Sequence, residues 1–130
     1  MSIPRTVLSE VVPEASTSLF SGSLVDEAGE ALGAAQLASF RMTLYTLTTG
    51  FPIVNALDSV DVLNAGRGTV SAGGAWTITL EPADNAILAA NAHLSVELRR
   101  LLLEWTYGPA GAKAGRHEIE YQVANLQHVP

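Results

Sequence analysis

Hydrophobic and polar residues alternate along much of the chain, and the alternation is clearest between residues 75 and 80. Trp76, Ile78 and Leu80 fall on one face of this segment, and Thr77 and Thr79 fall on the other. Successive side chains of an extended strand point to opposite sides, so a period of two residues predicts a strand with one face on a core. We therefore expect residues 75–80 to form a half-buried strand.

The last third of the chain predicts an antiparallel hairpin. Residues 96–107 and 116–123 keep the alternation, and the glycine-rich segment 108–115 between them has the composition of a turn. The positions predicted to face a core are Leu101, Leu103, Trp105, His117, Ile119, Tyr121 and Val123. The positions predicted to face solvent are Arg100, Leu102, Glu104, Glu118 and Glu120. Cross-strand ion pairs are the expected role of these outward charges.

Shorter strand candidates, separated by turn residues, precede this hairpin. The full set of predicted strands is 17–25, 40–48, 51–56, 69–71, 75–80, 96–107 and 116–123. Short helical turns are predicted at 33–39, 58–64 and 82–88. About seven short strands separated by turns are typical of a β-sandwich or a barrel.

The first sixteen residues show neither a helical nor an alternating period. Pro4 and Pro13 bias the residues before them towards extended backbone, and we interpret residues 1–16 as an extended arm that precedes one domain of residues 17–130. Such a terminus is either a loose tail or a segment that docks on a neighbour. The apolar residues that favour docking, and are therefore candidate partner-binding residues, are Ile3, Val7, Leu8, Val11 and Val12. Leu102 is a further candidate, because the alternation turns it outward.

Composition narrows the class of protein. The 130 residues are 48% hydrophobic and only 15% charged, which excludes a highly charged, disordered chain. The 13 acidic and 7 basic residues give a net charge of −6, and this balance does not supply the basic patch that nucleic-acid binding needs. The chain has no cysteine, so disulfides, cysteine-bound metals and thiol catalysis are excluded. No segment is typical of a signal peptide or a membrane helix, so we expect a soluble protein with no membrane partner.

Side chains able to do chemistry are few, and the pattern favours a structural role for each. His117 lies in phase with core-facing residues and is expected at the rim of the core, and no serine stands in the motif of a hydrolase nucleophile. Asp58, Asp61 and Asn64 are spaced to lie on one face of a helical turn. Their expected role is to cap this turn and to form its solvent-exposed face. No catalytic activity, metal or cofactor is predicted.

Pairs of adjacent polar residues receive a similar interpretation. Asp84 and Asn85 follow a proline at a predicted helical turn and are expected to cap it on the surface. Arg99 and Arg100 stand among glutamates and are expected to offset their charge. Interface cores are depleted of charge, so the sparsely charged surface favours contact with other proteins.

Three segments contain an ordered series of motifs. They are TLYTLTTGFPIVNA (43–56), VDVLNAGRGTVSAGGAWTITLEPADNAI (60–87) and LEWTYGPAGAKAGRHEIEYQV (103–123). Together they resemble a group of small structural proteins of tailed bacteriophages, over roughly residues 18–126. Related phage modules, including the N-terminal domain of baseplate upper proteins, resemble immunoglobulin-type sandwiches. The chain departs from antibody domains in lacking both cysteines of the inter-sheet disulfide.

The resemblance implies an all-β, immunoglobulin-like antiparallel sandwich with an extended N-terminal arm, and no active-site residue is carried over. The first expectation is an accessory virion protein that decorates the head, made in the cytoplasm of the bacterial host. It would form a homo-oligomer or bind in many copies to the major capsid protein or other virion proteins. One alternative is a module attached to the neck or tail. Another is a carbohydrate-binding or host-adhesion module that uses Tyr45 and Tyr107.

Overall fold

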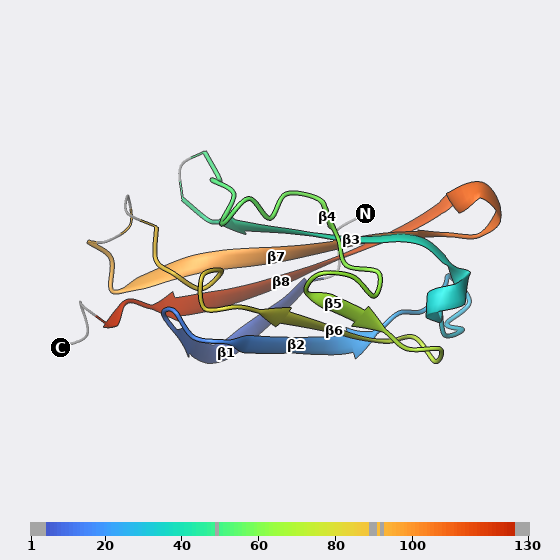
Figure 1. The fold of residues 1–130 in the computed structure, drawn as a ribbon, viewed down its shortest axis with the longest axis horizontal. Coiled ribbons are helices and arrows are strands. Elements are labelled where there is room, and N and C mark those ends of the chain that lie inside the picture. The colour runs from blue at the N-terminus through green and yellow to red at the C-terminus, as the bar shows by residue number, and fades with distance from the viewer. Residues whose placement is uncertain (1–4, 49, 89–90, 92, 127–130) are drawn as a thin grey trace.

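The computed structural model describes residues 5–48, 50–88, 91 and 93–126, which form a mostly β, two-layered structure (Figure 1). One sheet has the spatial order β1-β8-β7-β3-β4, and the smaller sheet has the order β2-β6-β5. The strands are β1 (Arg5–Pro13), β2 (Ser18–Ser23), β3 (Leu37–Thr46), β4 (Val60–Asp61), β5 (Gly68–Val70), β6 (Ala75–Leu80), β7 (Val96–Tyr107) and β8 (Lys113–Ala124). Two short 3-10 turns connect strands among these residues: η1 (Ala34–Gln36) lies between β2 and β3, and η3 (Pro109–Gly111) lies between β7 and β8.

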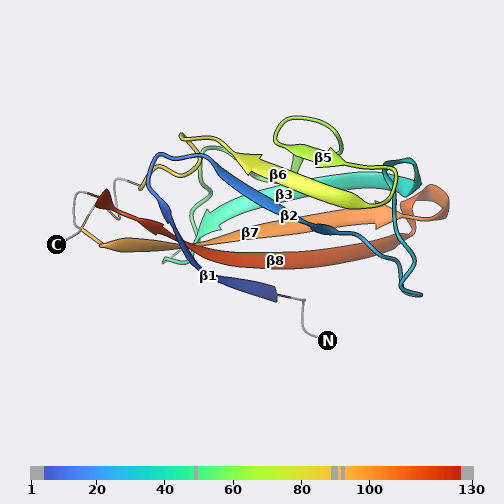
Figure 2. The same cartoon turned by 90° about the horizontal axis from the view of Figure 1, so that it is seen from below.

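The hydrophobic core fills the space between the two sheets (Figure 2). Each strand presents every second side chain to the interior, so the inner faces of β3, β7 and β8 meet those of β2 and β6. Phe40 lies at the centre of an aromatic cluster, with its ring centroid 6.4 Å from those of both Trp76 and Trp105. Such edge-on contacts stabilise a core beyond the burial of apolar area alone.

The strand predictions with the longest alternation are confirmed. β6 and β7 begin and end at the predicted residues, and β8 begins at Lys113 rather than at residue 116. β7 and β8 pair antiparallel from Val96 opposite Ala124 to Tyr107 opposite Lys113. Along both strands the residues predicted to face the core do so, and the predicted turn within 33–39 is present as η1.

Two short elements differ from the prediction. The expected strand 51–56 contributes only one bridge, from Ile53 to Tyr45, because Phe51 and Asn55 have φ angles of 44° and 51° that interrupt extended backbone. The expected helical turn 58–64 contains the short strand β4 instead. Asp61 accepts a hydrogen bond from Leu63 N, and Asn64 accepts one from Val70 N. These side chains stabilise turns, and their spacing of three residues is the same as that of one face of a helix.

The N-terminal segment is extended, as predicted, but residues 5–13 belong to the larger sheet and do not form a separate arm. They form β1, which pairs in parallel with β8 from Arg5 opposite Glu118 to Pro13 opposite Ala124. This pairing also corrects the expectation of an antiparallel sandwich, because it makes the larger sheet mixed. The supported fold class is mostly β with two sheets. Among the described residues, no helix has the length and apolarity to cross a membrane.

Candidate functional site

A fully buried ion pair lies on the inner face of β7. Glu97 and Arg99 are both 0% exposed, and Arg99 Nε donates a hydrogen bond to Glu97 Oε1 at 2.5 Å. The second oxygen, Glu97 Oε2, accepts hydrogen bonds from Leu88 N at 3.1 Å and from Asn91 Nδ2 at 2.9 Å. Removing two charges from water is costly, and the cost is offset when both groups are bonded on all sides as here.

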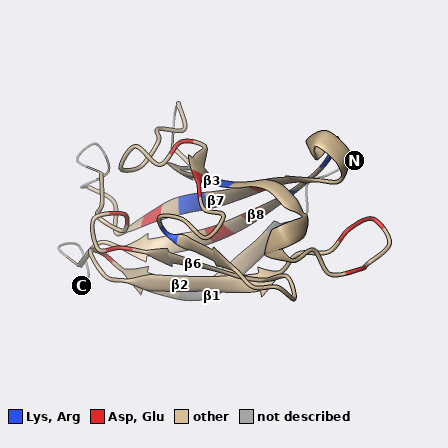
Figure 3. Cartoon of the chain, turned by 45° about the vertical axis from the view of Figure 1, so that its right-hand side comes forward, with Lys and Arg blue, Asp and Glu red and all other residues tan. Residues whose placement is uncertain are grey.

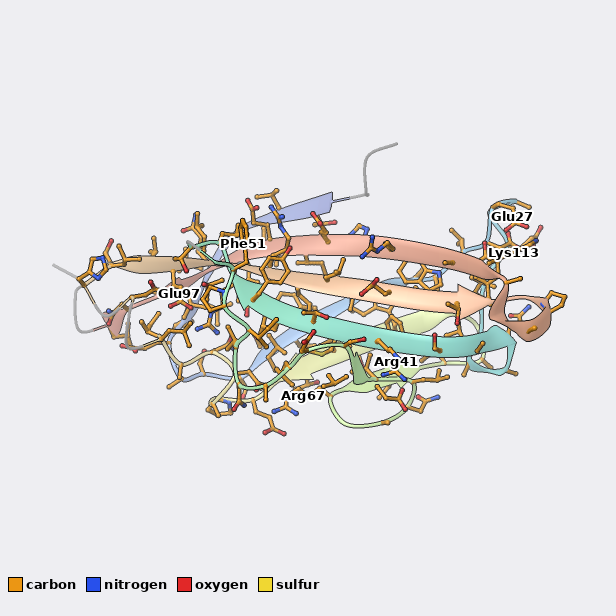
Figure 4. The ribbon with its side chains drawn as sticks, turned by 90° about the horizontal axis from the view of Figure 1, so that it is seen from above. Glu27, Arg41, Phe51, Arg67, Glu97 and Lys113 are labelled. Atoms are coloured by element: carbon orange, nitrogen blue, oxygen red, sulfur yellow. The ribbon has the colours of Figure 1, made fainter. Side chains whose placement is uncertain are left out.

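Asp84 joins this ion pair to the smaller sheet. Arg99 donates to the backbone carbonyl of Asp84, and the Asp84 carboxylate accepts hydrogen bonds from Arg67 and from Asn55 Nδ2 at 2.8 Å. Asp84 is 0% exposed, so the prediction of a surface cap is wrong. An irregular segment that is buried needs internal hydrogen-bond partners, and the carboxylate supplies them. Figure 4 marks Glu97 and Arg67, which enter this arrangement from different layers.

Asn85 connects the turn between β1 and β2 to β8. Its Nδ2 donates to Ser16 O at 2.8 Å and to Ser18 Oγ at 2.9 Å, and its Oδ1 accepts the hydroxyl proton of Tyr121 at 3.1 Å. Asn85 is also fully buried, which again differs from the predicted surface cap. Burial raises the pKa of Tyr121 to about 12, so its hydroxyl remains a neutral donor at physiological pH.

The buried polar network, defined as Asp84, Asn85, Glu97, Arg99 and Tyr121, has the residue types of an active site. Its geometry instead fastens the chain between β6 and β7 to both sheets, because its side chains bond to one another and to the backbone. Within the described ranges, no group of three His, Asp or Glu side chains is placed to hold a metal ion. The arrangement therefore positions chain segments.

Replacing Asp84 with asparagine is expected to reduce stability at pH 7 by about 1–2 kcal/mol and to weaken its acid dependence. Burial opposes ionisation of Asp84, but hydrogen bonds from Arg67, Asn55 and the Glu81 backbone outweigh it and hold the pKa of Asp84 below its ordinary value. A lowered folded-state pKa gives stability that is present above the unfolded pKa of about 4 and is lost as pH falls through the folded value. Urea unfolding between pH 6 and pH 2 measures this, and equal pH slopes for the two proteins would contradict it.

The outer face of the larger sheet carries the predicted cross-strand ion pairs. Arg100 lies 3.0 Å from Glu120 and 3.6 Å from Glu118, and Arg116 lies 2.9 Å from Glu104. The interpretation of these charges as strand-to-strand pairs is confirmed, but Glu118, which was predicted to face solvent, is only 7% exposed. Arg100 offsets glutamates as expected, whereas Arg99 does so inside the core. Figure 3 shows how few segments of the ribbon carry charge.

A surface cluster fastens the loop after β2 to the tip of the β7–β8 hairpin. Lys113 Nζ lies 2.5 Å from Glu27 Oε1, and the Tyr107 hydroxyl donates to Glu27 Oε2 at 2.6 Å. Figure 4 shows Glu27 and Lys113 side by side at this end of the molecule. The hydrogen bonds from Lys113 and then from Tyr107 lower the pKa of Glu27 to about 2. Tyr107 is therefore engaged in holding a loop.

Tyr45, the other tyrosine considered for carbohydrate binding, lies far from Tyr107. Tyr45 sits opposite Arg100 in the sheet and packs edge-on against Phe51, with ring centroids 6.1 Å apart. Tyr107 sits opposite Leu37, so the two tyrosines are separated by the length of β3 from position 37 to 45, about 26 Å. They do not form one stacking platform.

An open groove follows one side of the sandwich, between β2 and the edge of the larger sheet formed by β1 and β8. We call it the edge groove, and its volume is about 560 Å³. The lining residues are Thr6, Leu8, Leu19, Phe20, Ser21, Gly22, Ser23, Leu24, Trp76, Trp105, His117 and Ile119. None of them is an acid, a lysine or an arginine. The groove therefore lacks carboxylate, ammonium and guanidinium groups, and it mixes aromatic, aliphatic and hydroxyl groups with one imidazole, that of His117.

Two glycines make room for the tryptophans of the edge groove. Gly22 lies opposite Trp76 in the smaller sheet, and Gly115 lies opposite Trp105 in the larger one. In each pair the indole lies across the neighbouring glycine, where a Cβ atom would come 2.8 Å from Trp76 Cζ2 or 2.5 Å from Trp105 Nε1. A larger residue at either position would displace the ring, so glycine is required at both.

The predicted partner-binding residues do not form one surface. Leu8 lines the edge groove and Val12 packs on the core, whereas Val7 and Val11 are 63% and 44% exposed on the outer face of the larger sheet. Leu102 is half-buried on that same outer face. Ile3 lies outside the described residues. His117 is at the rim of the core, as predicted, with Nε2 2.9 Å from Thr6 Oγ1.

The sequence contains a signal for the edge groove that the prediction did not use. Gly22 and Gly115 stand at core-facing positions of alternating strands, where a side chain would otherwise fill the interior.

Comparison of the chain with protein-family models, with curated proteins and with solved structures found no match.

Proposed function

We propose that this chain is an accessory structural protein of a tailed-phage virion that binds other virion proteins. The observation that carries the proposal is the edge groove, an opening without acids, lysines or arginines beside the edge of β2, which pairs with no further strand among the described residues. Unpaired strand edges and charge-poor, aromatic-lined surfaces are features of protein contact. The resemblance of segments 43–56, 60–87 and 103–123 to phage structural proteins supports the virion as the setting.

We also propose that the sandwich is of the immunoglobulin type, and its strand order supports this. In variable-type immunoglobulin domains, strands G, F, C and C′ form one sheet, and B, E and D lie together in the other. If β2 is lettered B and the lettering continues in chain order, β8-β7-β3-β4 becomes G-F-C-C′ and β2-β6-β5 becomes B-E-D. Core contacts join the two sheets without a disulfide, and one of them packs Phe20 of β2 on Tyr121 of β8 at a ring-centroid distance of 5.1 Å.

Purified particles from the bacterium that carries the gene test the virion role. An antibody against the recombinant protein is expected to detect the chain in gradient-purified particles, at a constant ratio to the major capsid protein. Gold labelling over the capsid would support head decoration, and labelling confined to the neck or tail would support the alternative location. A chain that is synthesised during particle production but is absent from purified particles would overturn the virion role.

Particles from a strain in which the gene is deleted provide the control. They should give no signal, and adding the purified protein should restore it. Restored labelling that saturates would show a defined number of sites, whereas labelling that rises without limit would mark adsorption and count against the proposal.

A further inference from the structure

One side of β2 has backbone hydrogen-bonding groups that face away from its sheet. Leu24 N donates to Gly74 O at 2.9 Å, which fixes the phase of the ladder between β2 and β6. Bonded and non-bonded pairs alternate in an antiparallel ladder, so the even-numbered residues of β2 bond to β6. The N–H and C=O groups of Leu19, Ser21 and Ser23 therefore point to the open side. Among the described strands, none pairs with β2 on that side.

The opposite edge of the same sheet is closed by the chain itself. The outward N–H groups of β5 belong to Gly68, which donates to Ala65 O at 3.0 Å, and to Val70, which donates to Asn64 Oδ1 at 2.8 Å. Asn64 Nδ2 also donates to Val70 O at 3.1 Å. A free strand edge risks association with other chains, and proteins commonly cover it. Among the described residues, the chain therefore covers the outer edge of β5 but not that of β2.

The edge groove lies directly beside the open side of β2. A strand added there would direct every second side chain between the sheets, towards Trp76 and Trp105. The indole N–H of Trp105 is buried and has no acceptor within the described part of the chain. Buried indole N–H groups usually find a partner. The lining contains no acid, lysine or arginine, and its one imidazole, His117, lies 2.9 Å from Thr6 Oγ1. It therefore favours an uncharged segment, because a charge in the groove would lose its hydration without meeting an acid, a lysine or an arginine.

We propose that the free edge of β2 accepts an extended segment of a partner protein as an additional strand, with its alternate apolar side chains in the edge groove. The segment spans about five residues, opposite Leu19–Ser23, and carries no charge on its inward positions. Backbone hydrogen bonds supply affinity and the tryptophan-lined groove supplies selectivity. This inference rests on the proposed role as a binding protein and adds the surface and the class of partner.

A displayed library of random linear 12-residue peptides, selected on the full chain, tests the strand addition. Enriched peptides are expected to alternate apolar with other residues and to lack charge on the apolar register. Hydrogen exchange then reports the site, because the amides of Leu19, Ser21 and Ser23 should exchange at least about tenfold more slowly when peptide is bound. Enriched peptides that protect amides elsewhere, or the absence of any enriched peptide, would overturn the proposal.

Ser21→Pro is the matched variant, because the N–H that it removes faces the open side and takes no part in the ladder to β6. It is expected to weaken the selected peptides at least tenfold, whereas the control Ser21→Thr, which keeps the N–H, binds as the original protein does. If Ser21→Pro fails to fold, the original protein is tested with two versions of a selected peptide, one methylated on the odd-numbered and one on the even-numbered backbone nitrogens. One of these two registers should lose binding, because its methyl groups replace the N–H groups that face β2. Unchanged affinity for both registers, or for folded Ser21→Pro, would overturn the inference.

Particle incorporation separates this inference from the proposed function. Ser21→Pro protein that enters particles normally, while peptide binding is lost, would overturn the edge of β2 as the particle contact and leave the virion role intact. Peptide binding at β2 by a chain that is absent from particles would overturn the virion role and leave the strand addition intact. Loss of both activities in Ser21→Pro supports both.

Discussion

Replacing Arg99 with methionine is expected to lower the free energy of unfolding by about 3–5 kcal/mol. The substitution leaves the Glu97 carboxylate without its counter-ion at a position that is 0% exposed, and it also removes the donors that reach the carbonyls of Asp84 and Ala86. A buried charge that loses its partner is among the largest single-site costs in proteins. Urea unfolding at pH 7, followed by tryptophan fluorescence, measures the loss.

Arg116→Met provides the matched control on the adjacent strand. Arg116 and its partner Glu104 have side chains that are 50% and 38% exposed, so their pair should contribute less than about 1 kcal/mol. The double variant Glu97→Gln with Arg99→Met should cost less than the sum of the two single variants, because each single variant already breaks the same pair. Equal losses for Arg99→Met and Arg116→Met, or strict additivity, would contradict the buried pair.

Gly115→Ala is expected to destabilise the protein by about 2–3 kcal/mol, although it adds a single methyl group. The new Cβ would lie 2.5 Å from Trp105 Nε1, and the indole cannot move freely because it packs edge-on against Phe40. The shift of the ring should also appear in the near-ultraviolet circular dichroism of the folded protein. Thermal and urea unfolding give the magnitude.

Gly73→Ala is the control for the added methyl group. Its new Cβ would have Ser71 Oγ as its closest neighbour, at 3.9 Å, so its effect should stay within about 0.5 kcal/mol. Combining Gly115→Ala with Trp105→Leu should cost less than the two changes separately, because the smaller side chain removes the clash. A Gly115→Ala protein as stable as the original would show that the indole does not lie across Gly115.

The parts of the fold that followed from the sequence are those set by a single local period. β6 and β7 have the predicted bounds because alternation holds over their whole length and turns flank them. β1 was foreseen as extended, but its partner was not, because the choice of a parallel neighbour at a sheet edge depends on the position of β8 and leaves no local pattern. The short strand β4 was missed because its two residues are too few to show a period and because Asp58, Asp61 and Asn64 have the spacing of a helical turn.

The buried polar network was missed for a different physical reason. Counting back by two from Leu101 places Arg99 and Glu97 on the core face, so the alternation did contain their position. Charged side chains are rarely buried, and that general expectation outweighed the period. Asp84 and Asn85 gave no such signal, because their partners come from segments distant in the sequence. The outward ion pairs were predictable since both partners face each other across one hairpin.

The pairing of β1 with β8 sets the order in which the molecule is able to fold. Thr6 and His117, which touch across this pair, are separated by 111 positions in the sequence, and Glu14 accepts a hydrogen bond from Leu126 N over a separation of 112. Contacts between such distant residues carry a high entropic cost and slow the folding reaction. On the ribosome, β1 must wait for its partner until β8 has been synthesised. Completion of the larger sheet therefore follows the synthesis of β8, and until then β1 remains open to capture by other proteins.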